Sequence, residues 1–492
     1  MNLKGKITIC LLLLAAVLSG SCNKEPVLTP GDVPVPTVRM DGYYAAFDEQ
    51  ASTFLATLPA VTDFSAIPLQ VCSGADRILM DGEELPREGM TLDFRQPRTI
   101  RVIFGNTYHD FTLSARNTGL PVVRLNTPRP ITSKEDWVAG ASLRIENADG
   151  SLDYEGPTSV RGRGNSTWNY PKKPYAIKLD EKAEILGMPS HKRWVLLANW
   201  KDRTILRNDA AFWLSKQSGL EYTVRGQFVE LVLNGKHAGN YYLCEQIKIN
   251  KKRVNVEDGG YLIEMDTYFD EVNRFLSEEF LLPWMVKEPD EDALSPEAFA
   301  ALKEWVRKLE ALLKDEDRVL AHEYESWIDV DSAIDYLLVE ELTANHDFYN
   351  TWPTNMPPGP HSTYLYLQPD GKLFTGPVWD FDYHSFVPDR THFWAGADKT
   401  MYYPALLKDP KFRERLVERW EMQKDRFRQL PAYIDGMAEY LSLSQAVNQV
   451  MWPIDNKENG DETMSYNAAV ERMKKAFTDK WEWMDANIRN LK

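Results

Sequence analysis

The feature that most constrains the fold of this chain is the order of two patterns, strand-like runs first and helical spacing after them. From about Leu120 onward, strand-like runs fill the first half of the remaining sequence and helical spacing fills the second half. The run 228–233 is followed by Asn234 and Gly235, which accept positive φ at both turn positions and predict a tight hairpin. Strands followed by helices predict an α+β domain with two lobes.

Helical periodicity marks two segments of the second half. Ser295 can cap a helix that has Pro296 at its first position. The apolar residues that follow recur at three- and four-residue spacing: Phe299, Leu302, Val306, Leu309 and Leu313. The same spacing recurs near the C-terminus at Val470, Met473, Phe477, Trp481 and Met484. Such stripes indicate buried faces of helices.

The first residues have the pattern of an export signal. Lys4 and Lys6 precede an apolar run, residues 7–18, that is too short to span a bilayer comfortably. Small residues 19–21 then lead to Cys22, which is similar to a bacterial lipobox. This pattern predicts a lipid on Cys22 and a chain anchored in the cell envelope, at the outer membrane or cell surface. An ordinary secretory signal is the alternative.

Composition divides the chain into four expected parts. Residues 1–21 form the lipoprotein signal peptide, and the Pro-rich residues 22–36 suit an extended tether. Residues 37–118 carry short strand-like runs separated by turn formers, which predict a small β-sandwich of the immunoglobulin-like kind. Residues 119–492 form the main α+β domain.

Net charge limits the partners of the chain. The formal charge is -16 at pH 7, which disfavours the phosphate backbone of a nucleic acid. We therefore expect no nucleic-acid partner, and contact with a membrane only through the N-terminal lipid anchor.

A glycine-rich turn and a lysine form the first candidate site. In Arg161-Gly-Arg163-Gly the glycines let the backbone approach a ligand, and both arginines can bind anionic oxygens. Lys178 follows on a strand-like run, where its ammonium could hold a phosphate. A tight turn before a strand is the structural alternative.

A loop aspartate forms the second candidate site. Asp347 comes just after a predicted helix end, where a loop can present its carboxylate to a cleft. There it could orient an attacking hydroxyl and accept its proton. Asn350 or Asn345 could supply a carbonyl that faces a metal ion. A capped loop with solvated polar residues is the alternative.

Two aspartates that flank an aromatic form the third candidate site. Asp380 and Asp382 are spaced i and i+2, so on a straight strand they face opposite sides. They can converge on one ion only where the strand ends or bends. Mg²⁺ prefers such oxygen ligands, usually shared with phosphate. Unpaired aspartates in an apolar run are costly to bury, which favours a metal site.

These segments follow the order of the parts of a kinase: glycine-rich turn, strand lysine, loop aspartate and metal-binding aspartates. Several runs together resemble the spore-coat protein H (CotH) family of atypical kinases. The matching runs are 161–167, 172–179, 194–208, 234–245, 259–264 and 379–382.

The resemblance implies a two-lobed, atypical protein-kinase-like domain that binds ATP with Mg²⁺ and phosphorylates serine or threonine of a protein partner. By the same resemblance, Asp347 is the catalytic aspartate, Asp380 and Asp382 bind the metal, and Lys178 binds the nucleotide phosphates. Arg161, Arg163 and Asn350 complete the expected cofactor-binding set.

Two hypotheses remain open at this point. The first is an active CotH-like kinase that uses Asp347 and Asp380. The second is a catalytically inactive surface lipoprotein with the same fold, which binds a protein or a glycan.

Overall fold

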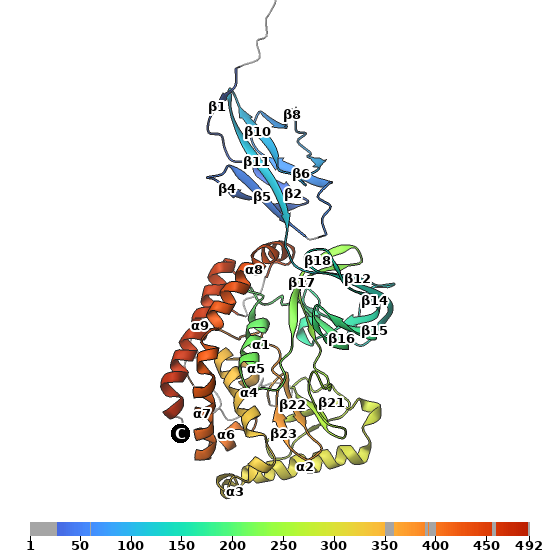
Figure 1. The fold of residues 1–492 in the computed structure, drawn as a ribbon, viewed down its shortest axis with the longest axis vertical. Helices are drawn as coiled ribbons and strands as arrows, with labels where there is room; N and C mark the ends of the chain where they lie inside the picture. Colours follow the sequence, from blue (N-terminus) through green and yellow to red (C-terminus); the bar gives the residue numbers. More distant parts are fainter. Residues whose placement is uncertain are drawn as a thin grey trace, which may run out of the picture. The chain divides into compact units, whose positions relative to one another are not determined.

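The computed structural model of the protein describes residues 27–59, 61–349, 359–388, 392, 400–454 and 459–490. The chain divides into two compact units (Figure 1). The first comprises the described residues up to Ala56 together with Phe64–Ala115, and the second comprises Thr57–Asp63 and the residues from Arg116 onward. The predicted signal peptide, its Cys22 and the predicted cofactor-binding Asn350 lie outside the described residues.

The first unit consists of two sheets. Its strands are β1 (Thr29–Pro30), β2 (Thr37–Met40), β3 (Tyr43–Tyr44), β4 (Ala46–Asp48), β5 (Thr53–Leu58), β6 (Ile67–Cys72), β7 (Arg77–Met80), β8 (Glu83–Glu84), β9 (Met90–Leu92), β10 (Arg98–Phe104) and β11 (Thr107–Asn117). One sheet has the order β4-β5-β11-β10-β7-β8 with β1 beside β11, and the other has the order β3-β2-β6-β9. On β6, alternate residues are buried and exposed, so one face of the sheet packs inward. The immunoglobulin-like character of this unit stays a prediction.

A closed barrel opens the second unit. Its strands are β12 (Val122–Asn126), β13 (Val138–Glu146), β14 (Leu152–Gly162), β15 (Tyr175–Ile185), β16 (Met188–Leu197), β17 (Gly226–Leu233) and β18 (Lys236–Glu245). The order is β12-β13-β14-β15-β16-β18-β17, and parallel pairing of β12 with β17 closes the barrel. Its interior is packed by buried apolar side chains such as Leu143, Ile177 and Trp194.

A second sheet and the helices complete the unit. The sheet has the order β20-β21-β19-β22-β23, made of β19 (Tyr261–Met265), β20 (Arg274–Leu276), β21 (Pro283–Glu288), β22 (Thr363–Leu367) and β23 (Leu373–Thr375). The helices are α1 (Arg207–Gln217), α2 (Pro296–Lys314), α3 (Glu316–Leu320), α4 (Val330–Thr343), α5 (His346–Tyr349), α6 (Tyr403–Leu406), α7 (Pro410–Phe427), α8 (Leu430–Met451) and α9 (Tyr466–Asn487), with 3₁₀ turns η1 (Ser166–Asn169), η2 (Glu291–Ala293), η3 (Glu323–Ser326) and η5 (Ile488–Asn490). In Figure 1, α7, α8 and α9 lie along one side of this unit. The predicted α+β class is confirmed.

Local predictions from the sequence are also confirmed. Asn234 and Gly235 have φ of 50° and 75° and connect β17 to β18. Ser295 caps α2, because its hydroxyl accepts a hydrogen bond from the Ala298 amide at 3.2 Å. The apolar stripe predicted near the C-terminus is buried along α9. Among the described residues, none of the helices is both long and apolar enough to cross a membrane.

A buried ion-pair cluster joins α1 to the C-terminal segment. The guanidinium of Arg207 lies between the carboxylates of Asp202 and Asp461, and all three side chains are inaccessible to solvent. Its Nε also donates to the carbonyl of Ser385 at 2.9 Å. The cluster therefore fixes three segments that are distant in the sequence to one another.

Replacing Arg207 with methionine is expected to lower the free energy of unfolding of the second unit by about 3–5 kcal/mol, because two buried carboxylates lose their counter-charge. Urea denaturation followed by tryptophan fluorescence measures this unit selectively, since all 15 tryptophans lie at or after Trp137.

The matched control is Lys475→Met, which removes a cation from an exposed pair with Asp479. It should change the free energy of unfolding by at most about 0.5 kcal/mol. An Arg207→Met protein as stable as this control would show that the buried cluster does not hold the segments together.

Candidate functional site

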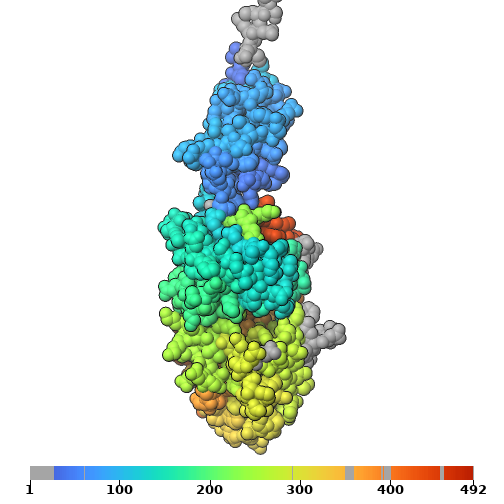
Figure 2. Space-filling view, turned by 90° about the vertical axis from the view of Figure 1, so that its right-hand side faces the viewer, coloured from blue at the N-terminus to red at the C-terminus, as the bar shows by residue number. Residues whose placement is uncertain are grey.

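A cavity of about 330 Å³ lies between loops of the barrel and loops of the second sheet. Four aspartates line it: Asp266, Asp347, Asp380 and Asp382. We call it the carboxylate pocket. In Figure 2 the barrel, in teal, meets the yellow-green segment that follows it, with orange atoms of the later chain visible in the recess. The three aspartates singled out from the sequence thus come together, joined by Asp266, which the sequence did not reveal.

Backbone turns aim these carboxylates at one another. Asp266 directly follows β19. Helix α4 ends at Thr343. The next residue, Ala344, has a φ of 50° that reverses the chain before the single turn α5, which carries Asp347. Asp380 has a φ of 70°, so the chain bends between it and Asp382. The bend is what allows carboxylates at i and i+2 to enter one cavity.

Two buried asparagines hold the Asp380–Asp382 segment in place. The side-chain oxygen of Asn208, in the first turn of α1, accepts a hydrogen bond from the Phe381 amide at 2.8 Å. Asn459 donates to the carbonyl of Asp382 at 2.9 Å and to the carbonyl of Lys201 at 3.1 Å. The segment is therefore positioned by α1 and by the chain that precedes α9.

Burial and mutual repulsion favour the protonated forms of Asp380 and Asp382. Burial is the largest cause that raises the pKa of each carboxyl above its ordinary value. The charge of Arg163 opposes this rise at Asp380, and the charge of Lys201 opposes it at Asp382. The carboxyl groups of Asp380 and Asp382 also share a hydrogen bond. The pair therefore lacks enough positive charge to ionise fully.

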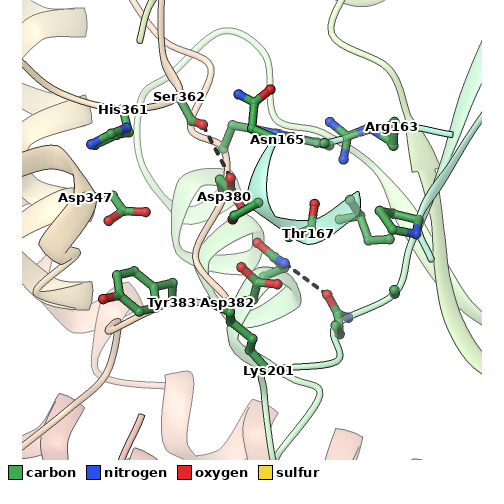
Figure 3. Close-up of a pocket in the computed structure, with 18 of the residues that line it drawn as sticks. Arg163, Asn165, Thr167, Lys201, Asp347, His361, Ser362, Asp380, Asp382 and Tyr383 are labelled. Atoms are coloured by element: carbon green, nitrogen blue, oxygen red, sulfur yellow. Dashed lines mark hydrogen bonds between the residues drawn. The ribbon is translucent and has the colours of Figure 1, made fainter. Parts of the chain in front are cut away.

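Asp347 has a pKa shifted close to neutrality. The pKa of its carboxyl is raised from 3.8 to about 7. Burial is the largest cause, the charges of Asp380 and Asp266 also raise the pKa, and the charges of His361 and Lys201 oppose the rise. A carboxylate with such a pKa can accept a proton at neutral pH. The carboxylate faces the pocket in Figure 3.

His361 and Ser362 connect the aspartates. The Ser362 hydroxyl lies 3.3 Å from a carboxylate oxygen of Asp266 and 3.3 Å from one of Asp380. Figure 3 shows its hydrogen bond to Asp380. Burial lowers the pKa of His361, but its hydrogen bond to Asp266 and the surrounding carboxylate charges outweigh burial and raise it overall. Both residues follow the Pro-rich sequence run 351–360, and no local pattern of the sequence assigned them to the site.

Two positively charged side chains, Arg163 and Lys201, line the carboxylate pocket beside its aspartates. Arg163 stands over the ring of Trp379 at 5.2 Å and lines the pocket from the glycine-rich turn. The ammonium of Lys201 lies 4.5 Å from the ring centre of Tyr170 and 4.7 Å from that of Tyr383. Figure 3 shows Arg163 and Lys201 on opposite sides of Asp380 and Asp382. An anion entering the pocket would meet a positive charge on either side.

The placement of Lys178 corrects the sequence prediction. Lys178 is exposed on β15 and lines neither of the cavities described here. Its neighbours Ile177 and Leu179 point into the barrel, so alternation turns Lys178 outward to solvent. The lysines that line the carboxylate pocket are Lys201 and Lys172.

The surroundings of Lys172 indicate a structural role for this residue. It is 1% exposed and donates to the carbonyls of Ala198, at 2.8 Å, and Asn240. Burial lowers the pKa of its amine to about 7. Because two carbonyls of the barrel wall hold the amine, Lys172 fixes the shape of the pocket.

A second cavity of about 340 Å³ adjoins the first. We call it the linker pocket, because residues 246–248, which leave the barrel toward the second sheet, form part of its wall. Arg161 lines this cavity and not the carboxylate pocket. Six residues line both cavities: Arg163, Gly164, Asn165, Glu264, Asp266 and Trp379. A ligand long enough could therefore occupy both.

The donor set of the carboxylate pocket fits Mg²⁺ shared with a phosphate. Within the described residues there is no group of three or more His, Cys, Asp or Glu side chains placed to hold a metal ion. Mg²⁺ usually takes only one or two carboxylates from the protein and completes its shell with waters and phosphate oxygens. Asp380 and Asp382 supply such a pair of carboxylates, because the positive charge around them is too small to compensate both of them.

The fold and the site define a class of α+β domain in which a closed barrel and a helix-covered sheet meet at an acidic cavity. The family model described as CotH kinase protein matches residues 160–484, about two thirds of the chain. The chain therefore belongs to the CotH kinase family, and it is a kinase-like protein. No curated protein matches it.

The raised pKa of Asp347 predicts a pH-dependent stability. The folded pKa of about 7 exceeds the ordinary 3.8, so the stability that Asp347 contributes is full below pH 4 and is lost as pH rises through 7. Asp347→Asn should therefore be more stable than the wild type at pH 8, by about 1–3 kcal/mol, with the difference vanishing near pH 4. Urea denaturation across this pH range, without added Mg²⁺, measures the difference.

The control for this prediction is Asp479→Asn, which alters an exposed carboxylate on α9. Its stability should follow the wild type at both pH values. Equal pH profiles for Asp347→Asn and the wild type would mean that the pocket does not shift the titration of Asp347.

Proposed function

We propose that this protein is a CotH-type kinase that transfers the γ-phosphoryl group of ATP to a serine or threonine of a protein acceptor at the cell envelope. The observation that carries the proposal is the convergence of Asp347, Asp380 and Asp382 on one cavity flanked by Arg163 and Lys201. Carboxylates for a metal and a base, with cations for phosphate, are what phosphoryl transfer requires.

The architecture supports a two-lobed arrangement. In this proposal the barrel with α1 is the smaller lobe, and the second sheet with α2 to α9 is the larger lobe. Residues 246–260 connect the two, and both cavities lie against loops from each lobe. A nucleotide would bind where the lobes meet, as ligands commonly do at such interfaces.

Asp347 would act as the general base. The hydroxyl oxygen of the acceptor forms a bond to the γ-phosphorus of ATP, the bond from that phosphorus to its bridging oxygen breaks, and ADP leaves with the bonding electron pair. The hydroxyl proton passes to the carboxylate of Asp347, whose pKa of about 7 suits this transfer.

The remaining pocket residues would position the phosphates. Asp380 and Asp382 would hold Mg²⁺, which neutralises charge on phosphate oxygens when it is bound. Ser362 orients Asp380 through its hydroxyl. Arg163 and Lys201 would face the transferred group from two sides, where fixed positive charge stabilises the charge of the transition state.

Two substitutions separate binding from transfer. Asp380→Ala should abolish the rise in stability that saturating Mg²⁺ and ATP give the wild type, about 2.7 kcal/mol at a hundredfold excess over Kd. Asp347→Asn should keep most of that rise but lower transfer at least about 100-fold, because the base is lost. Thermal unfolding measures binding, and ³²P transfer to a serine and threonine peptide library measures catalysis.

Lys178→Met is the matched control, since Lys178 is exposed outside both cavities. It should leave binding and transfer unchanged. A wild type that Mg²⁺ and ATP do not stabilise would end the kinase proposal and leave the surface-binding hypothesis.

We also propose that Cys22 carries a lipid that anchors the protein in the envelope. Cells fed a clickable fatty acid should label the wild-type protein, and Cys22→Ser should lose the label. Cys72→Ser serves as the control, because Cys72 is an exposed, free thiol of the first unit, and it should stay labelled. Labelling of Cys22→Ser would contradict the proposal.

A further inference from the structure

Asn345 lies between helix α4 and the single turn α5 that carries Asp347. The sequence makes its side-chain carbonyl a candidate to face a metal ion. In the structure, however, Asn345 is only 3% exposed and lines neither the carboxylate pocket nor the linker pocket. Because a buried amide group finds its partners inside the protein, the hydrogen bonds of Asn345 show what it does.

The side-chain oxygen of Asn345 binds two parts of the site at once. Its Oδ1 accepts a hydrogen bond from the backbone amide of Asp347 at 3.2 Å. The same oxygen accepts a hydrogen bond from the hydroxyl of Ser385 at 3.4 Å. A carbonyl oxygen has two lone pairs, so both hydrogen bonds can exist together. Asn345 therefore joins the residue that carries the proposed base to the chain that follows Asp382.

The Ser385 end of this link is fixed by the buried cluster around Arg207. Ser385 is fully buried, and its carbonyl accepts the hydrogen bond from Nε of Arg207 at 2.9 Å. The amide of the next residue, Phe386, donates to the carbonyl of Thr343 at the end of α4 at 2.7 Å. The chain beyond Asp382 is therefore bound to the Arg207 cluster and to α4.

The Asp347 end depends on Asn345 for a partner of its amide. Amides at the start of a helix have no partner within the helix, and α5 comprises only four residues. The side chain of Asn345 supplies the missing acceptor, as asparagine does for the amide two residues ahead in a turn. The backbone of Asn345 is itself held, because its amide donates to the carbonyl of Glu340 on α4 at 3.2 Å.

We infer that Asn345 is a positioning residue for phosphoryl transfer, which fixes the base Asp347 at a set separation from the metal-binding segment 380–382. It acts through the backbone amide of Asp347 and the hydroxyl of Ser385. The inference rests on the proposed function, in which Asp347 accepts the acceptor proton while Asp380 and Asp382 hold Mg²⁺. Both groups must be in place together, since a misplacement of about 1 Å can lower a rate about 100-fold.

Three variants separate the two hydrogen bonds of Asn345. Asn345→Ala removes both of them. Asn345→Ser keeps an acceptor for the Asp347 amide, as serine does more weakly in such turns, but its shorter side chain loses the bond to Ser385. Ser385→Ala removes only that second bond. Urea denaturation followed by tryptophan fluorescence checks that each variant is folded.

Hydrogen exchange followed by mass spectrometry tests the geometry without any assay of activity. In peptides of the whole chain that contain the Asp347 amide, Asn345→Ala should exchange about tenfold faster than the wild type, the typical effect of one lost hydrogen bond. Asn345→Ser and Ser385→Ala should stay within about threefold of the wild type, because the amide keeps an acceptor.

Transfer of ³²P to the peptide library tests the consequence for catalysis. Asn345→Ala should lower kcat by about 10- to 100-fold and leave KM for ATP unchanged, because Asn345 lines neither cavity. The loss should vanish beside Asp347→Asn, so the double variant should be as fast as Asp347→Asn alone. A merely structural defect would slow the enzyme in that background too.

Asp329→Ala is the matched control. Asp329 caps the other end of α4, where its carboxylate accepts a hydrogen bond from the Ser332 amide at 2.8 Å, and it lines neither cavity. The substitution thus removes a bond of the same kind from the same helix. It should change neither kcat nor hydrogen exchange at the Asp347 amide.

The outcomes separate this inference from the proposed function. A wild type that transfers no phosphate ends the proposed function, and the inference with it. An active wild type beside a folded Asn345→Ala protein of unchanged kcat overturns only the inference. So does a loss of kcat that persists in full beside Asp347→Asn, or an Asp347 amide that exchanges no faster in Asn345→Ala than in the wild type.

Discussion

The buried guanidinium of Arg207 is the interaction on which the geometry of the site depends. It compensates Asp202 and Asp461 and binds the carbonyl of Ser385, so the start of α1, the chain beyond Asp382 and the chain before α9 stay together. A buried ion pair adds little net stability, but breaking one is costly. Its physical effect is therefore specificity of arrangement, and the next residue, Asn208, uses that arrangement to hold the Phe381 amide.

The fold holds the aspartates of the carboxylate pocket together although their negative charges repel one another. Asp347, Asp380 and Asp382 all have raised pKa values because burial and neighbouring carboxylates disfavour their charge. Buried carboxylates that disfavour one another's charge are found mainly at functional sites. A fold under no functional constraint would avoid such a cluster. The flanking cations offset only part of the negative charge, which leaves a cavity suited to a bound cation together with phosphate.

Lys178 and Lys201 illustrate how far the sequence could predict the site. A lysine on a strand after a glycine-rich turn satisfied the expected order of kinase parts, yet β15 turns Lys178 to solvent. Lys201 lies beyond the end of β16, within the run 194–208 that resembles the CotH family, but the order of kinase parts did not single it out. The rings of Tyr170 and Tyr383 hold it in the cavity. Strand periodicity gives the face of a residue relative to its neighbours, and it does not say which face borders a cleft.

The sequence by itself determined the local structure: the hairpin at Asn234, the cap at Ser295, the buried stripe of α9, and the requirement that the chain bend if Asp380 and Asp382 are to act together. These features depend on backbone geometry within a few residues, which adjacent side chains specify. Only the tertiary structure decided that Asp266 and Asp347 join that pair in one cavity. Those contacts arise where the barrel packs against the second sheet, and packing between distant segments leaves no periodic trace in the sequence.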